Sequence, residues 1–563
     1  MKLIELVMEQ VDTYIANINK VICSNISAFS NVNRGFLSQN ILSQLRNLVE
    51  HTALKAFSNG RDIAITYQNI EQANQFVHTK GNLNFLYKFH KLLQITTSHY
   101  TLDPENSERL MLKYYEYLLK IKSYLYSDHN LIVLENIDQF PLNTDTTLKK
   151  YYEKIAAQLQ QPPYLRKNSY NDRYYILKSR PFFVSEEIYY EVTFSLASNR
   201  TSKFDRLIAF TKHDISTNYA TKLLISESNI QILGKRMPIL IIDAWEVSIR
   251  PCELNNFAKI FGVHHEFGNS KEISGLMSFL TQSKLSLVEF IDSPQPYFQE
   301  TITQITKSAK NVYFLPILKR CRKISELNLP GNNIIRYLLH KLHNVIIKQQ
   351  YSPEKCERLS ELFLRYGCIP FDQIPYNTSL INHNPKLSDL FQCIDINDRE
   401  PELFARFIRN NIEINNQLYT DKKELAQFVN IDELIREYNT RLYLPKHVSR
   451  QLLSFHDHIY IQDYENDTIE IIRHIQACSA ESVNNYTNSV DIWLRTSTYD
   501  IDCEEKKESL RYLFAKSRVA LIYGSAGTGK STMINHISNF LNDKKKIYLA
   551  NTNPAVDKSK KKS

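Results

Sequence analysis

The sequence has few glycines and no long apolar run. Only 12 of its 563 residues are glycine, so a local cluster of glycines cannot be attributed to composition. No stretch approaches the roughly 18 uninterrupted apolar residues that mark a membrane-spanning helix, and the best run, at 237–245, has the length of a buried strand. Glu5 and Glu9 interrupt the segment in which a secretion signal needs apolar residues. We therefore expect a cytoplasmic protein with no membrane partner.

Cysteine motifs are absent as well. The eight cysteines are scattered along the chain. No pair has the Cys-x-x-Cys spacing of a structural zinc site, and the scatter argues against a disulfide scaffold. This pattern indicates reduced thiols, as expected in the cytoplasm.

What the sequence does have is an ordinary globular composition with an excess of positive charge. Hydrophobic residues make up 43% and charged residues 23%, which provides ample material for a core. The length suits about three or four domains. The net charge of +9 suits a polyanionic partner such as nucleic acid, although four of the lysines lie in the last six residues.

Hydrophobic periodicity divides the chain into regions of different secondary structure. Apolar residues at 3–4 spacing predict helices before residue 160, and the paired prolines Pro162 and Pro163 end this pattern. Segments rich in Ile, Tyr, Val and Phe predict strands up to about residue 251, after which helical spacing returns. We therefore predict a multidomain α+β protein. Its regions are a helical bundle over 1–160, a β-rich domain over 161–255, a mainly helical domain over 256–480, a linker over 481–500 and an incomplete P-loop (RecA-like) α/β domain over 501–563.

A phosphate-binding loop motif stands near the end of the sequence. The stretch "RVALIYGSAGTGKST" (518–532) predicts a buried strand, a glycine loop and the start of a helix. In this pattern Lys530 reaches the β- and γ-phosphates, and Ser531 offers its hydroxyl to Mg²⁺. The motif predicts binding of ATP with Mg²⁺, and the alternative is a glycine turn between a strand and a helix. The predicted nucleotide-binding residues are Gly524, Ser525, Ala526, Gly527, Thr528, Gly529, Lys530, Ser531 and Thr532.

The residues around this loop resemble those of superfamily 1 helicases. After a second predicted strand, "IYLA", the segment "NTNPAVD" (551–557) is similar to motif Ia of the branch that holds RecD-like and nonsense-decay-type enzymes. The resemblance covers residues 500–557 and implies an ATP-hydrolysing enzyme that moves on or remodels DNA or RNA. It also implies contacts to single-stranded nucleic acid from Thr552, Asn553 and Pro554. The family's adenine-reading glutamine aligns with Lys506, so this sequence departs from the family there.

Only part of the family's ATPase is recognisable in this sequence. The family also needs an Asp–Glu pair on a later strand and arginines from a second RecA-like domain. After Asp557 the chain reads "KSKKKS", a lysine-dense ending that a slipped reading frame in an A-rich tract would produce. We therefore expect the N-terminal portion of a helicase-like protein, truncated just after motif Ia, which binds nucleotide at most. The alternative is a non-enzymatic scaffold that binds a partner through residues 160–480.

A second motif lies in the N-terminal helices. The stretch "RNLVEH" places Arg46 and His51 on a strongly periodic helix and resembles the motif of HEPN ribonucleases. That resemblance implies a homodimer through the N-terminal helical domain and metal-independent RNA cleavage, with Arg46 steadying the phosphate and His51 transferring a proton. The motif is short, so the alternative is a pair of solvated side chains on an amphipathic helix. Helicase-like proteins with a HEPN domain resemble antiviral defence architectures, which points to phage defence or nucleic-acid processing.

Three further constellations favour structural interpretations. The stretch 164–183 interleaves basic residues with tyrosines, which suits single-stranded nucleic acid but also suits a strand with solvated charges over a tyrosine-rich core. His456 and His458 lack a third metal ligand at a recognisable spacing. Asp243 and Glu246 lie in a predicted buried strand.

Overall fold

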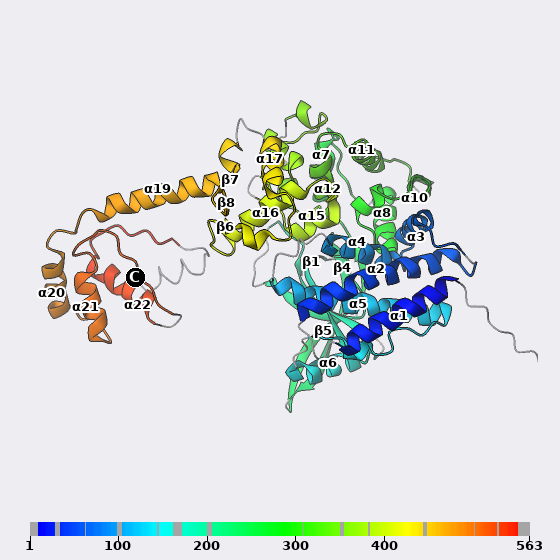
Figure 1. The fold of residues 1–563 in the computed structure, drawn as a ribbon, viewed down its shortest axis with the longest axis horizontal. Helices are drawn as coiled ribbons and strands as arrows, with labels where there is room; N and C mark the ends of the chain where they lie inside the picture. Colours follow the sequence, from blue (N-terminus) through cyan, green and yellow to red (C-terminus); the bar gives the residue numbers. More distant parts are fainter. Residues whose placement is uncertain are drawn as a thin grey trace, which may run out of the picture. The chain divides into compact units, whose positions relative to one another are not determined.

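The computed structural model has a mixed α+β fold that divides into two compact units (Figure 1). Unit 1 comprises Met1–Asn410 and Leu425–Lys446, and unit 2 comprises Asn411–Glu424 and His447–Ser563. Among the described residues, none of the helices combines the length and apolar character needed to cross a bilayer. The structure describes residues 10–28, 34–61, 63–97, 104–142, 146–161, 172–199, 205–232, 234–268, 270–307, 309–348, 354–380, 383–442, 447–499, 501–525 and 528–549.

Helices at the start of unit 1 share one apolar core, as the 3–4 spacing predicts. Ile15, Leu45 and Leu118 come from different helices and are all buried in this core. The second helix contacts the first, third, fourth and fifth, so it occupies the centre of the bundle. The helices are α1 (Gln10–Ala28), α2 (Arg34–Ser58), α3 (Tyr67–Thr79), α4 (Asn84–Thr97) and α5 (Pro104–His129).

Five strands follow and close into a barrel. They are β1 (Arg173–Val184), β2 (Glu187–Leu196), β3 (Leu207–Thr211), β4 (Thr221–Ile232) and β5 (Lys235–Val247). Their order is β1-β2-β3-β5-β4, with β3 and β5 parallel and the other neighbours antiparallel. A short ladder from β4 to Arg173 and Tyr174 of β1 closes the barrel. Apolar side chains such as Val192, Phe194 and Ile242 fill its interior.

Helix α6 (Thr146–Leu159) packs on the barrel, although the sequence predicts it as part of the N-terminal bundle. Its Ile155 and Leu159 are buried in one cluster with Phe182 of β1 and Phe210 of β3. Aromatic side chains on these strands need an apolar cover, and the stripe of α6 provides it. The predicted domain boundary at residue 160 therefore falls between α6 and the barrel strands on which α6 packs.

Helices make up the rest of unit 1, and buried carboxylates cap some of them. Glu272 accepts hydrogen bonds from the backbone amides of Tyr313, Phe314 and Leu315, at 3.0, 2.8 and 2.8 Å. These amides stand at the start of a helix, where no intrahelical partner exists for them. The helices are α7 (Pro251–Ile260), α8 (Lys271–Ser283), α9 (Leu287–Ile291), α10 (Gln295–Lys307), α11 (Leu315–Glu326), α12 (Asn332–His340), α13 (Val345–Lys348), α14 (Ile369–Gln373), α15 (Leu387–Cys393), α16 (Glu400–Glu413, which crosses into unit 2) and α17 (Ile431–Arg441).

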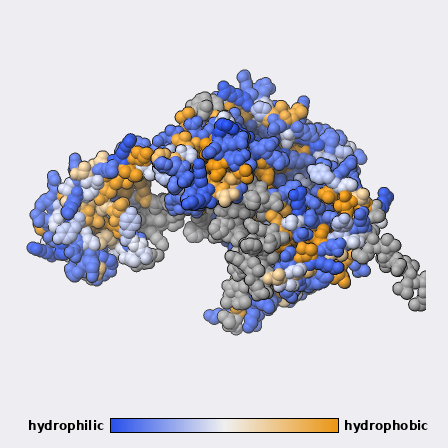
Figure 2. Space-filling view, in the orientation of Figure 1, coloured by the Kyte–Doolittle hydropathy of each residue, from blue (hydrophilic) through white to orange (hydrophobic). Residues whose placement is uncertain are grey.

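Unit 2 contains a small sheet, a long helix and a C-terminal cluster of helices. The sheet has the order β6-β8-β7. Helix α19 has no buried residue, and hydrophobic surface is visible along it in Figure 2. The last three helices share a core that includes Tyr486, Val490, Leu510 and Met533. The elements are β6 (Thr420–Asp421), β7 (Leu452–Phe455), β8 (His458–Ile461), α19 (Gln462–Ser479), α20 (Tyr486–Thr496), α21 (Glu504–Tyr512) and α22 (Lys530–Phe540).

Helix α20 occupies most of the segment that the sequence predicts as a linker, 481–500. Tyr486, Val490 and Trp493 recur at helical spacing and pack into the C-terminal core. The polar residues between them form the exposed side of the helix. The prediction of a linker is therefore wrong for this segment, because its few apolar residues have a core to join.

Candidate nucleotide site

The glycine loop ends in a helix, as its motif predicts. Helix α22 begins at Lys530, and Gly529 caps it with a φ of +84°. This left-handed conformation strains any residue that has a side chain. A Cβ at Gly529 would also lie 3.0 Å from Nζ of Lys506, and a Cβ at Gly524 would lie 2.6 Å from Oγ1 of Thr528. Glycine is therefore favoured at both of these positions.

The side chain of Lys530 turns back into the loop. Its Nζ donates hydrogen bonds to the carbonyl oxygens of Gly524 and Ser525, at 2.6 and 2.7 Å. Oγ1 of Thr528 donates to the Ser525 carbonyl at 2.9 Å, which tightens the turn. The ammonium lies close to the N-terminus of α22, where the helix dipole and the unpaired amides also attract anions. The loop thus combines a lysine ammonium with the positive end of a helix.

The other predicted contact residues fall into two groups. Ser531 and Thr532 are exposed on the first turn of α22, where a bound nucleotide could reach their hydroxyls. The rest lie outside the described residues; they are Ala526, Gly527, Thr552, Asn553 and Pro554.

The residues on either side of the loop do not form the strands that the sequence predicts at 519–523 and 547–550. None of the described residues in these segments belongs to a strand. Leu521 is 66% exposed and Leu549 is 90% exposed, so they are not in a core. A strand needs the backbone of a neighbour beside it, and the sheet that the described part of unit 2 contains is formed only by β6, β7 and β8. Helix α22 instead buries Met533 against α20 and α21.

A second lysine reaches the same loop. The ammonium of Lys506, on α21, lies beside Gly529. It also forms an ion pair with Asp502, whose carboxylate oxygens lie 2.7 and 2.6 Å from Nζ. The hydrogen bond to Asp502 raises the pKa of Lys506, so the side chain stays charged. Sequence reasoning notes Lys506 only as a departure from the helicase pattern and misses Asp502; the i, i+4 spacing of the two residues is the signal that could have found the pair.

The structure does not bring Arg46 and His51 together within one chain. Five residues on an α-helix correspond to a rotation of about 140°, so the two side chains leave α2 on different faces. Arg46 is half exposed and pairs with Glu50 at 2.9 Å. His51 is 8% exposed, stacks on Tyr14 at 5.5 Å and donates from Nδ1 to the Asn47 carbonyl at 2.7 Å. The interpretation of both residues as solvated side chains is therefore wrong for His51, which is buried in the contact between α1 and α2.

Arg46 instead belongs to a hydrogen-bonded group that links α2 to α4. Oε1 of Glu50 lies 2.9 Å from Nε of Arg46 and 2.9 Å from Nε2 of His90. Burial acts to raise the pKa of Glu50, but hydrogen bonds from His90 and Arg46 outweigh it and the pKa is lowered. The i, i+4 spacing of Arg46 and Glu50 indicates their ion pair. The sequence carries no signal for the contact with His90, which lies on another helix and 40 residues from Glu50.

In the described part of the stretch 164–183, a tyrosine side chain is buried while basic side chains are exposed to solvent. Tyr175 is buried and donates its hydroxyl proton to Glu253, while Lys178 and Arg180 are exposed on β1. Residues 164–171 lie outside the described residues. The interpretation as a strand with solvated charges over a tyrosine-rich core agrees with this arrangement.

The two remaining constellations show no metal geometry. In the part of the chain that the structure describes, no group of three or more His, Cys, Asp and Glu side chains could hold a metal ion. His458 is exposed at the start of β8, and His456 lies in the turn before it. Asp243 and Glu246 lie on β5, and the carboxylate of Glu246 pairs with Lys222 of the neighbouring strand at 3.2 Å.

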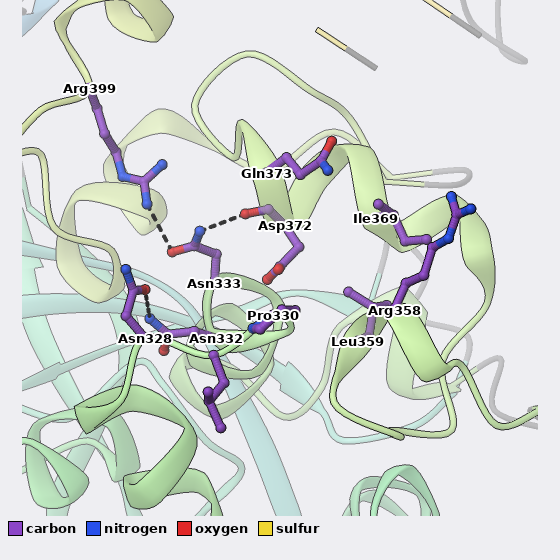
Figure 3. Close-up of a pocket in the computed structure, with 11 residues that line it drawn as sticks. Asn328, Pro330, Asn332, Asn333, Arg358, Leu359, Ile369, Asp372, Gln373 and Arg399 are labelled. Atoms are coloured by element: carbon purple, nitrogen blue, oxygen red, sulfur yellow. Dashed lines mark hydrogen bonds between the residues drawn. The ribbon is translucent and has the colours of Figure 1, made fainter. Parts of the chain in front are cut away.

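Unit 1 also contains a cavity of about 360 Å³ beside the N-terminus of α12 (Figure 3). The carboxylate of Asp372 accepts hydrogen bonds there from the backbone amides of Gly331 and Ile334, at 2.6 and 3.1 Å. The side chain of Asn333 donates to the Asp372 carbonyl at 2.6 Å and accepts from Arg399 at 3.3 Å. Burial raises the pKa of Asp372. These polar groups bond to one another and cap α12, so their presence needs no ligand to explain it.

Comparison with protein-family models, with curated proteins and with solved structures finds no match to this chain. A functional assignment therefore depends on the motif and on the geometry of the glycine loop.

Proposed function

We propose that unit 2 carries the nucleotide-binding part of an ATP-dependent nucleic-acid helicase or translocase. The observation that carries this proposal is the position of Lys530, whose ammonium lies inside a glycine loop at the N-terminus of α22. The β- and γ-phosphates of a nucleotide would replace the Gly524 and Ser525 carbonyls as partners of this ammonium. The partner in this proposal is a single-stranded nucleic acid, and its support is the similarity of the sequence around the loop to that of helicases.

The described residues fit the phosphates of ATP and supply one contact to Mg²⁺. Lys530 and the amides of α22 offer contacts to phosphate, and the exposed hydroxyl of Ser531 offers a contact to the metal. Hydrolysis also needs carboxylates that hold Mg²⁺ and orient water, and arginines that stabilise charge in the transition state. The described residues offer no cluster of metal-ligating side chains. We therefore propose that this chain binds ATP without hydrolysing it at the rate of a helicase.

Titration of the full chain with a fluorescent ATP analogue, with and without Mg²⁺, tests this proposal. We expect Lys530→Ala to weaken binding by about tenfold or more, because it removes a charge-assisted contact to phosphate. Ser531→Ala should reduce only the part of the affinity that depends on Mg²⁺. Lys544→Ala removes an exposed lysine that pairs with Asp543 and serves as the control. Equal binding by the wild type and by Lys530→Ala would contradict the proposal, and ATP turnover at helicase rates would contradict its second part.

The barrel of unit 1 is the specific feature that favours a nucleic-acid partner for this chain. Closed five-stranded barrels with this strand order have the Greek-key topology of the OB-fold, a fold that binds oligonucleotides on the face of strands 2 and 3. In this barrel the register aligns Lys178, Thr193 and Ile208 across β1, β2 and β3. Arg180, two residues after Lys178, lies on the same face of β1. Glu191 of β2 lies opposite Arg180, and α6 covers this face at Phe182 and Phe210. The open part of the face offers Lys178, Arg180 and the exposed side chain of Ile208 to a single strand.

Fluorescence anisotropy with labelled single-stranded DNA and RNA tests the barrel. We expect the double variant Lys178→Glu and Arg180→Glu to weaken binding by about tenfold and to flatten its salt dependence, because contacts to phosphates are lost. Lys235→Glu makes one of these charge changes on β5 and is the control for net charge. If the control weakens binding as much as the double variant, the face of β1–β3 is not the binding surface.

A further inference from the structure

The position of Lys506 is fixed by the packing of α21 on α22. Leu510, one turn further along α21, is buried in one core with Met533 of α22. This contact holds the preceding turn of α21 against the loop end of α22. The side chain of Lys506 is only 20% exposed, although it is a lysine near the surface. A Cβ at Gly529 would lie 3.0 Å from its Nζ and 3.4 Å from its Cε, so the end of the side chain lies directly against the loop.

We propose that Lys506 is a second phosphate-binding cation of this site, so that the loop takes nucleoside di- and triphosphates through two lysines. The inference rests on the nucleotide site proposed above and names a further residue in it. A polyphosphate at the N-terminus of α22 meets Lys530 from within the loop and Lys506 from the side of Gly529. Two ammonium groups near one anion add their attractions, and both act close to the unpaired amides of the helix.

Asp502 has the opposite effect on the same ligand. Its carboxylate holds the Lys506 ammonium in place through both oxygens. The carboxylate is also a negative charge close to the site, and it competes with phosphate for Lys506. Side chains of Asp502 and Lys506 therefore make opposite contributions to the affinity for an anion.

Contact with the phosphates makes Lys506 a reader of charge. Its ammonium has three donors and no acceptor, and at the phosphate end of the site it adds no preference for one base over another. The site is expected to rank nucleotides by the number of phosphates, with ATP, GTP, CTP and UTP close to one another in affinity and AMP much weaker.

Competition titrations against the fluorescent ATP analogue, in the full chain, test this inference. We expect Lys506→Ala to weaken ATP and ADP by about tenfold and AMP by less than about twofold, since a charge-assisted contact to the distal phosphates is lost. Asp502→Asn should strengthen ATP binding by about two- to fivefold. The matched control is Lys507→Ala, which removes the neighbouring lysine on α21 and its ion pair with Glu504 at 2.6 Å. The control should bind as the wild type does.

The outcomes separate this inference from the proposed function. If the wild type binds ATP and Lys530→Ala does not, while Lys506→Ala matches the wild type, then Lys506 is not a phosphate ligand and the site itself stands. If the wild type does not bind ATP, or if Lys530→Ala binds equally well, the proposed function fails first. Thermal unfolding of each variant shows whether it is folded. Lys506→Met keeps most of the length of the side chain without its charge, and should lose as much affinity as Lys506→Ala.

Discussion

Replacement of His51 by alanine should destabilise the protein, because this side chain is buried between α1 and α2. The variant loses the hydrogen bond from Nδ1 to the Asn47 carbonyl, worth about 1 kcal/mol. It also loses the stacking contact with Tyr14, worth about 0.5–1.5 kcal/mol. With the small void that remains, we expect the free energy of unfolding of unit 1 to fall by about 2–3 kcal/mol. Arg46→Ala should cost less than about 1 kcal/mol, since its ion pair with Glu50 is half exposed.

Urea unfolding of the wild type, Arg46→Ala and His51→Ala measures these differences, and an RNA-cleavage assay without metal on the same three samples tests the alternative. A ribonuclease that uses both residues would lose cleavage in both variants while each remains folded. If His51 has a structural role, His51→Ala loses much stability and Arg46→Ala loses little. If His51→Ala is as stable as the wild type, and cleavage disappears in both variants, the structural interpretation is refuted.

Three further predictions concern the remaining sites. Burial lowers the pKa of His340 and of His343 to about 4, below the value of about 6.5 in the unfolded chain. The unfolded state therefore takes up protons first as the pH drops, and the free energy of unfolding should fall by about 2 kcal/mol per histidine between pH 7 and pH 5. Urea unfolding at the two pH values measures this difference, and equal stability at both would contradict it. Asp372→Ala leaves the Gly331 and Ile334 amides at the start of α12 without their partner, and should lower the free energy of unfolding by about 2 kcal/mol; a loss below about 0.5 kcal/mol would argue against the cap. Gly529→Ala combines a left-handed φ with a close contact to Lys506 and should abolish ATP binding in the fluorescence titration, whereas unchanged affinity would show that the loop rearranges easily.

The parts of the fold that follow from local pattern could be predicted. The helical spacing of apolar residues such as Ile15 and Leu45 is a local signal that predicts α1 and α2. The glycine-loop motif is also local, and it predicts the helix that begins at Lys530. The β-rich character of 173–247 also follows from composition, although the closure of the barrel through Arg173 and Tyr174 does not. Closure joins β1 to β4, and no local pattern specifies which strands become neighbours.

The candidate sites show the same division. The sequence by itself determined the glycine loop, since its glycines and Lys530 are neighbours along the chain and their spacing encodes the turn. Only the tertiary structure decided that Lys506 and Asp502 lie beside that loop, because the packing of Leu510 against Met533 brings α21 to α22. It also decided that His90 of α4 contacts Glu50, the partner of Arg46, and that His51 stacks on Tyr14 of α1. Spacing along a helix indicates partners one turn away, but a partner on another helix is decided by the packing of the two helices.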